Sequence, residues 1–288
     1  MFAHNNSEID YFRMAVVNAG LIKKHLGVKV CVVTDSHSYD FVCETIPADK
    51  ISQVIDDLII TDKDRKFKHQ NAKVYRDTIH YQKSLSFYNI NRADAYEVSP
   101  YDETIMLDTD YLVLGDTLNQ CWGHKNEFMM NYAWQDINFK RKFELDRLSP
   151  SSITMYWATV VYFRKNDYSE HFFTLCKHVR ENIKYYKSLY QWSGATYRND
   201  YVFSIAAHLL EGLTERALKQ LPFTLYKSFD YDDIHSVQSD KEITMYLEKH
   251  DAPGQYILCK WKDLDLHIMN KWAINRALDD LTWHINNE

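Results

Sequence analysis

The stretch that decides the fold is Tyr101-Asp-Glu-Thr-Ile-Met-Leu-Asp-Thr-Asp-Tyr-Leu-Val-Leu-Gly-Asp116. Its apolar run at residues 104–107 predicts a short buried strand, and a second apolar run follows at residues 111–114. Asp108 and Asp110 stand between the runs. If the chain bends there, both carboxylates reach the same point, an arrangement that a hard divalent cation prefers. Asp-x-Asp triplets also occur by chance in exposed turns, so the rest of the chain has to support a metal site.

The segments around this stretch alternate between helix and strand patterns. Apolar residues recur at helical spacing from Tyr11 to Leu26, and Gly27 follows as a helix stop. Residues 61–76 are polar and basic. The other predicted elements are strands at 28–35, 55–60, 155–163, 243–247 and 255–260, and helices at 78–95 (frayed), 169–190, 200–212 and 271–285. This order predicts an α/β fold with a mostly parallel central sheet flanked by helices, in which ligands gather at the C-terminal ends of strands.

The composition narrows the class of protein. The chain has 288 residues, of which 45% are hydrophobic and 26% charged, so it can bury a sizeable core. The net charge of −6 argues against a general attraction to nucleic acid, although local basic patches remain open. Five widely spaced cysteines without a Cys-x-x-Cys pair predict reduced thiols and a cytoplasmic setting. No apolar run is long enough for a membrane span, and no signal peptide is recognisable.

Residues 101–116 closely resemble the metal motif of glycogenin-like and related family-8-type glycosyltransferases, which have the GT-A fold. The opening of the chain, from Phe2-Ala-His-Asn-Asn6 to Asp35, is similar to the uridine-binding opening of GT-A enzymes. The resemblance implies one Rossmann-like GT-A domain over residues 1–288, with a nucleotide-sugar-binding half at 1–125 and an acceptor-binding half at 126–288. It implies that the donor is bound by Ala3, His4, Asn5, Asn6, Tyr11, Arg13, Asp35, Asp108 and Thr109.

A third resemblance lies in Leu266-His-Ile-Met-Asn-Lys-Trp272. In the family, a late histidine completes the metal site and a following lysine approaches the diphosphate, in the motif His-x-x-Gly-x-x-Lys-Pro-Trp. Here the glycine and the proline are absent, and the spacing is shorter by two residues. The resemblance makes His267 the third metal ligand beside Asp108 and Asp110, and Lys271 the diphosphate lysine. The alternative for His267 is a packed or exposed histidine at a strand end.

Other positions resemble donor-sugar and donor-phosphate residues. Trp157-Ala-Thr-Val-Val161 stands where the family usually has Phe-Asn-Ala-Gly-Val, so Trp157 and Thr159 are expected to line a sugar pocket with a changed preference. Asp200 resembles the acidic residue near the anomeric carbon, and an ordinary helix cap is the equal alternative. Lys83 resembles a donor-phosphate lysine, with a solvated surface lysine as its alternative.

The resemblance implies an enzyme that transfers a hexosyl or pentosyl group from a nucleotide sugar, expected to be a UDP-sugar, to an acceptor hydroxyl. Mn²⁺ or Mg²⁺ held by Asp108, Asp110 and His267 would neutralise charge on the departing diphosphate, and Lys271 would add to this. Asp200 would steady the oxocarbenium-like sugar or orient the acceptor. Membership of the glycogenin-like branch would imply retention of the anomeric configuration.

Two other classes stay open. A sugar nucleotidyltransferase also uses metal-bound aspartates, but it normally opens with a glycine-rich loop, and residues 4–7 contain no glycine. A catalytically inactive module on the same fold would bind sugar or nucleic acid without turnover. The basic clusters Lys63–Lys68, near Lys73 and Arg76, and Lys140–Lys142 are either solvated loops or a grip for an anionic acceptor. A saccharide is the first expectation for the acceptor, and hydroxymethylated bases of phage-type DNA are the second.

Overall fold

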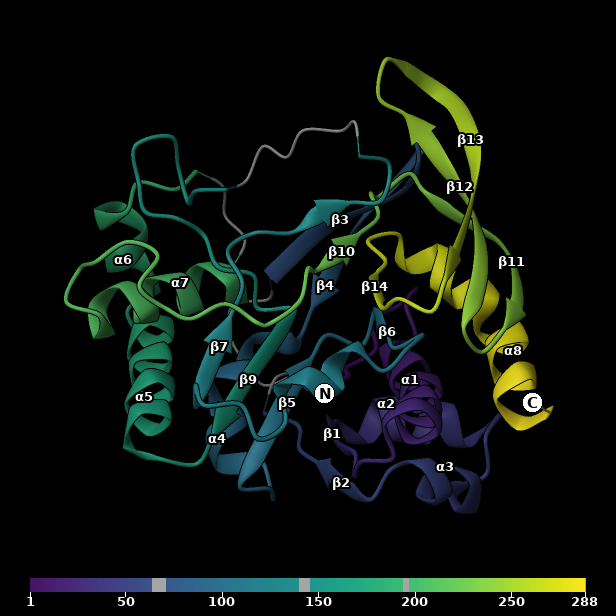
Figure 1. Cartoon of the computed structure of the whole chain (residues 1–288), viewed down its shortest axis with the longest axis horizontal. Coiled ribbons are helices and arrows are strands. Elements are labelled where there is room, and N and C mark those ends of the chain that lie inside the picture. The colour runs from purple at the N-terminus through teal and green to yellow at the C-terminus, as the bar shows by residue number, and fades with distance from the viewer. Residues whose placement is uncertain (64–70, 140–145, 194–196, 288) are drawn as a thin grey trace.

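The chain folds into several small sheets with helices on two sides of the molecule, and the β12–β13 hairpin projects beyond them (Figure 1). The computed structural model describes residues 1–63, 71–139, 146–193 and 197–287. Within these ranges the helices are α1 (Tyr11–Leu26), α2 (Ser36–Cys43), α3 (Ala48–Val54), α4 (Ala95–Val98), α5 (Asp167–Glu181), α6 (Ile183–Leu189), α7 (Asn199–Leu210) and α8 (Lys271–Asn287), with 3₁₀ turns η1 (Asn89–Asp94) and η2 (Thr117–Cys121). The strands are β1 (Cys31–Thr34), β2 (Asp57–Ile60), β3 (Asn71–Thr78), β4 (Tyr81–Phe87), β5 (Glu103–Leu107), β6 (Tyr111–Leu112), β7 (Phe128–Met130), β8 (Gln135–Asp136), β9 (Val160–Arg164), β10 (Tyr226–Lys227), β11 (Asp233–Ser239), β12 (Glu242–Lys249), β13 (Ala252–Lys262) and β14 (Leu266–His267).

The strand ladders run in both directions. β1 pairs with β2 in parallel, and Phe2 forms a parallel bridge to Val33. β5 and β7 both pair antiparallel with β9. In the sheet ordered β6-β14-β10-β8, the first pair is antiparallel and the other two are parallel. The hairpins β3–β4 and β11–β12–β13 are antiparallel.

The α/β class is as predicted, but the described residues form mixed sheets and no clear mostly parallel central sheet. The lengths of the connections explain the difference. Only two residues separate β3 from β4, β11 from β12 and β12 from β13, and such short turns join antiparallel neighbours. β1 and β2 are joined through α2 and α3, which gives the length that a parallel crossover needs.

The frayed helix predicted at residues 78–95 is wrong, because β3 and β4 form a hairpin there and helical turns begin only at η1. Along β3, Val74 is exposed and Tyr75 is buried, as the period of a strand requires. The Tyr11 hydroxyl donates to the Tyr75 hydroxyl at 3.0 Å, and the Tyr75 and Trp272 rings meet edge to face. These contacts with α1 and α8 hold the hairpin and override the weak helical pattern.

Two further predicted elements are altered: the helix at 169–190 breaks at Asn182 into α5 and α6, and the strand at 155–163 begins only at Val160.

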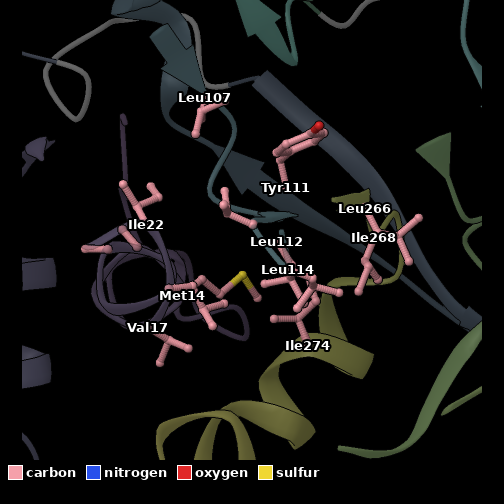
Figure 2. Close-up of a cluster of buried hydrophobic side chains, with 14 of the residues drawn as sticks. Met14, Val17, Ile22, Leu107, Tyr111, Leu112, Leu114, Leu266, Ile268 and Ile274 are labelled. Carbon is pink, nitrogen blue, oxygen red and sulfur yellow. The ribbon is translucent and has the colours of Figure 1, made fainter. Parts of the chain in front are cut away.

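Two apolar clusters flank the strands, with α1 and α8 on one side of the molecule and α5 and α7 on the other (Figure 1). In the first cluster, Met14 of α1 and Ile274 of α8 lie around Leu112 and Leu114 (Figure 2). The buried amide of Asn18 in α1 donates to Tyr111 O at 2.7 Å and accepts from Val113 N at 3.1 Å. Segments far apart in the sequence are thereby fixed side by side, and the candidate site forms where they meet.

All five cysteines of the chain are free thiols. Among the described residues, no helix combines the length and the apolar character that crossing a membrane requires.

Candidate metal and substrate site

Asp108 follows the last residue of β5, and its backbone continues the ladder to β9 because Asp108 N donates to Thr159 O at 2.9 Å. Its carboxylate pairs with Arg92 of η1, which also donates from Nη2 to Ala158 O at 2.5 Å. Burial raises the pKa of Asp108, the Arg92 guanidinium opposes that rise, and the neighbouring Asp110 carboxylate adds to it. A cation close to Asp108 would therefore stabilise its charged form.

Asp110 and His267 are brought together by the pairing of β6 with β14. Tyr111 lies opposite His267 in the ladder, and Ile268 N donates to Asp110 O at 2.9 Å. His267 Nε2 lies 3.4 Å from Asp110 Oδ2, while His267 Nδ1 lies 3.3 Å from Thr159 Oγ1. A hydrogen bond from Nδ1 to Thr159 would fix the ring and leave the Nε2 lone pair facing the carboxylates, as in a metal-ligating histidine.

The donor atoms of Asp108, Asp110 and His267 all lie within 4.8 Å of one another. Two carboxylate oxygens and one imidazole nitrogen form a set that suits Mn²⁺, whereas Mg²⁺ prefers oxygen ligands alone. The three residues thus fit a divalent cation, and all three were predicted as metal ligands.

Lys271, the first residue of α8, forms an ion pair with Asp110. Its ammonium also donates to Ile268 O at 3.1 Å. The side chains of Lys271 and Asp110 are only 4% and 8% exposed. Burial would raise the pKa of Asp110, but the positive charge of Lys271 and the contact with His267 hold it well below the usual range. Asp110 is therefore ionised throughout the neutral range.

Asp200 lies in the first turn of α7, and its carboxylate contacts the segment before β9. Oδ1 accepts from Ala158 N at 2.9 Å, and Oδ2 accepts from Arg198 Nη2 at 2.8 Å. The N-cap of α7 is Arg198, and no side-chain capping bond is formed there, so Asp200 does not act as the helix cap. Although burial opposes it, Arg198 lowers the pKa of Asp200. Asp200 is connected to the triad through Ala158, whose backbone N donates to Asp200 and whose carbonyl accepts from Arg92, the partner of Asp108.

The predicted nucleotide-binding opening is a network of turns and caps. Ala3 and His4 are buried, and Ala3 N donates to Val33 O at 2.8 Å. Asn5 Oδ1 accepts from Phe12 N at 2.8 Å, and Asn5 N donates to Ser38 Oγ at 2.7 Å. These bonds set the positions of α1 and α2 against the first residues of the chain.

Asn6 and Asp35 extend the same network. Asn6 Oδ1 accepts from the Ile9 backbone at 2.9 Å, and Asn6 Nδ2 donates to Ser86 O of β4 at 3.2 Å. Asp35 caps α2 by accepting from Ser38 N at 2.8 Å. The opening segment is thus held in one shape next to the β3–β4 hairpin.

The other predicted donor residues divide into two groups. Burial raises the pKa of the Tyr11 phenol well above its usual range; its hydroxyl bonds to that of Tyr75, whose ring meets Trp272, the residue after Lys271. Thr109, between the two aspartates, and Trp157 are both buried. Arg13 instead pairs with Asp279 of α8, and Lys83 pairs with Glu8 on the surface. The ion pairs of Arg13 and Lys83 do not involve the triad.

Sequence reasoning missed Arg92 and Lys227, and it treated Lys73 only as part of a basic stretch. Arg92 is the single cation in residues 88–100, and Lys227 is a lone lysine among aromatic residues in Leu225-Tyr-Lys-Ser-Phe229. An isolated cation in an apolar segment was the available signal. Of the basic clusters, residues 64–68 and 140–142 lie outside the described residues, and Lys63 is exposed.

In comparisons with known proteins, no protein-family model matches the chain and no curated protein matches it.

Proposed function

We propose that the protein is a metal-dependent glycosyltransferase with a GT-A-like arrangement, which moves a sugar from a nucleotide sugar, in the first place a UDP-sugar, to an acceptor hydroxyl. One observation carries the proposal: Asp108, Asp110 and His267 come from distant segments and converge in one cluster, with Lys271 on Asp110. A group of two carboxylates, an imidazole and an ammonium suits a divalent cation with a diphosphate, and here only Asp108 is partly exposed.

The placement of the cluster also supports this function. The triad follows the C-terminal end of β5, and the capped opening segment leads from Ala3 toward Tyr11 beside it. His267 is the last residue of β14, which pairs in parallel with β10, and ligands of α/β proteins gather at the C-terminal ends of parallel strands. The parallel pairing of β1 with β2 and of Phe2 with Val33 is compatible with the nucleotide-binding part of a GT-A domain.

The residues of the chain have distinct roles in the proposed reaction. Asp108, Asp110 and His267 would hold Mn²⁺ or Mg²⁺, which when bound supplies charge neutralisation at the diphosphate. Lys271 adds a positive charge on the same side, and Thr159 keeps the His267 ring oriented. Asp200 is kept ionised by Arg198, so it can orient an acceptor hydroxyl or steady positive charge on the sugar.

A catalytically inactive binding module on the same fold is the second candidate. Arg92 and Lys271 already neutralise Asp108 and Asp110, so these carboxylates are stable without further ligands. Such a module would bind a nucleotide sugar and leave it intact.

Turnover of nucleotide sugars separates the two candidates. We expect the wild-type protein to hydrolyse or transfer from at least one nucleotide sugar in the presence of Mn²⁺. Asp110→Ala should reduce this turnover by about 100-fold or more, because it removes a metal ligand. Asp116→Ala is the matched control, since Asp116 is an exposed aspartate in the same stretch whose side chain makes no capping bond.

Three results would count against the enzyme. The binding module would be favoured if the wild type bound UDP with Mn²⁺ but turned over no member of a broad donor panel. The proposed site would be wrong if Asp110→Ala kept its turnover, and any glycosyl-transfer function would be in doubt if UDP binding did not depend on metal.

A further inference from the structure

A cavity of about 320 Å³ lies between β1 and β5, and none of the triad residues lines it. One side consists of residues 28–31 and Val33, which are β1 and the segment before it, and the other side is the whole of β5. The remaining walls come from α1, α4 and η2 and are mostly apolar, with Ile22, Val98 and Leu118 among them. The cavity therefore has a strand on each of two sides and apolar side chains around it.

Both strands end a sheet on the side of this cavity. Within residues 1–63, 71–139, 146–193 and 197–287, β5 is the edge strand of the β5-β9-β7 sheet, and β1 pairs with no named strand except β2. Met1 and Phe2 line the same cavity, and Figure 1 draws the N-terminus between β1 and β5. The first residues of the chain thus lie at the gap between the two sheets.

Residues 1–3 already form the beginning of a strand beside β1. Ala3 N donates to Val33 O at 2.8 Å, and Val33 N donates to Met1 O at 2.9 Å. Met1 N continues the ladder by donating to Cys31 O at 2.8 Å. The bridge between Phe2 and Val33 is parallel, so this short strand runs in the direction of β1.

The register of this ladder extends directly into the cavity. Because Phe2 lies opposite Val33, Met1 lies opposite Val32, and the four positions before Met1 would lie beside residues 28–31. Those four residues all line the cavity. Four residues of strand span about 13 Å, and the five residues of β5 span about 16 Å, so the two lengths match.

The walls of the cavity also define the side chains that a strand there would carry. Its lining includes Ile22 of the apolar cluster around α1 and Ala95 of the cluster around α5 and α7, which flank the strands from two sides. A strand between them would be buried on both faces, and such strands are nearly continuous runs of apolar residues. Leu26, Val28 and Ile105 are only partly buried and would be covered by it.

We propose that this cavity is a strand site, filled by an extended run of about four apolar residues joined to Met1. The run would pair in parallel with β1 on one side and with β5 on the other, and it would join the β1–β2 and β5-β9-β7 sheets into one. The opening segment at residues 4–6 and the strand that leads to Asp108 would then belong to the same sheet. The inference does not depend on glycosyl transfer, since no ligand takes part in it.

The test compares the urea unfolding of two extended forms of the whole chain. One carries four Val or Ile residues before Met1 behind a short polar leader, and the other carries the same leader followed by four Gly or Ser residues, the number that the register gives. We expect the apolar extension to raise the urea midpoint by about 1 M over the Gly/Ser form, because apolar burial exceeds the cost of ordering the strand. Amide hydrogen exchange should also slow in β5 and in residues 28–31.

A substitution in the cavity wall checks that the extension lies in this site. Val28→Asp places a charge beside the proposed strand and should remove most of the gain in midpoint that the apolar extension gives. Val74→Asp is the matched control, because Val74 is 50% exposed on β3 and does not line the cavity, so the gain should persist there.

Equal midpoints for the apolar and the Gly/Ser extensions would overturn the inference, and this is the result expected if the cavity takes a small apolar molecule. A gain in midpoint without slower exchange in β5 would place the extension elsewhere and would overturn it too. So would a gain that Val28→Asp and Val74→Asp reduce equally.

Discussion

Replacing Lys271 by methionine tests whether the Asp110 site is built for a cation. Lys271 and Asp110 form a buried ion pair in which both side chains are more than nine-tenths covered. Removing one partner of such a pair typically costs about 3–5 kcal/mol, because the remaining charge stays buried and loses its counter-charge. Asp110 keeps its contact with His267 at 3.4 Å, so the lower end of this range, about 3 kcal/mol, is expected for the loss of unfolding free energy.

Binding of Mn²⁺ should restore the free energy of unfolding that Lys271→Met loses. In Lys271→Met, a divalent cation has no lysine to displace from Asp110, so the variant should bind Mn²⁺ more tightly than the wild type does. At a Mn²⁺ concentration of about 100 times its Kd, binding stabilises the folded state by about 2.7 kcal/mol, which is close to the expected loss. In the wild type Lys271 and His267 hold the pKa of Asp110 well below its usual range, and the variant loses the Lys271 contribution, so the two proteins are compared at neutral pH.

The assay is urea unfolding of wild type and Lys271→Met at neutral pH, with EDTA and with Mn²⁺. Lys260→Met is the control, because its pair with Glu242 lies on the surface, where ion pairs contribute little to stability, and it should not respond to metal. The reasoning is refuted if Lys271→Met in EDTA is as stable as the control, or if Mn²⁺ stabilises the wild type and the variant equally.

Three further predictions follow from single contacts. Thr159→Val removes the partner of His267 Nδ1 and should weaken Mn²⁺ binding by about tenfold in a metal titration, with the fold unchanged by circular dichroism. Tyr75→Phe removes a buried hydroxyl bond to Tyr11 and should lower the free energy of unfolding by about 1 kcal/mol in urea, a loss that Tyr11→Phe should share without adding to it. Burial raises the pKa of Asp265 to about 7, so between about pH 4 and pH 7 the folded protein keeps a proton that the unfolded chain loses; stability falls over this range and is constant above it. Asp265→Asn should therefore be more stable than the wild type at pH 8, by up to roughly 4 kcal/mol, and within about 1 kcal/mol of it at pH 4; unfolding curves that differ equally at both pH values would contradict this.

Residues whose role depends on neighbours in the sequence could be predicted from the sequence. Asp108 and Asp110 follow a strand of five residues, and His267 lies in the short strand that precedes the last helix; the resemblance of these two local motifs to those of glycogenin-like glycosyltransferases nominated all three. The helices α1 and α8 were predicted for the same reason, since their apolar spacing is regular. The Gly27 stop after α1 also appears, with φ at 65° and its N–H bonded to Lys23 O.

The parts that sequence could not predict depend on tertiary contacts. The β3–β4 hairpin has few buried residues of its own, and it is held from outside by Tyr11 and by Asn270, which donates to Asp77 at 2.9 Å. Arg92 pairs with Asp108 across 16 positions, and Lys227 reaches the site only through the β10–β14 ladder. No local spacing encodes such pairings, because they follow from how distant segments pack.

Lys271 takes part both in the stability of the buried site and in its proposed chemistry. It is placed by the start of α8, and its ammonium is bonded both to Asp110 and to the carbonyl of Ile268, so it is held where a metal would also meet Asp110. A lysine in that position stabilises the buried carboxylate, and when metal takes its place on Asp110 the ammonium is free to pair with a diphosphate oxygen on the same side. Metal binding would then switch Lys271 from a structural partner of Asp110 to a ligand of the donor. This order of events requires that Mn²⁺ increase the affinity for UDP in the wild type more than in Lys271→Met, and equal increases in the two proteins would exclude it.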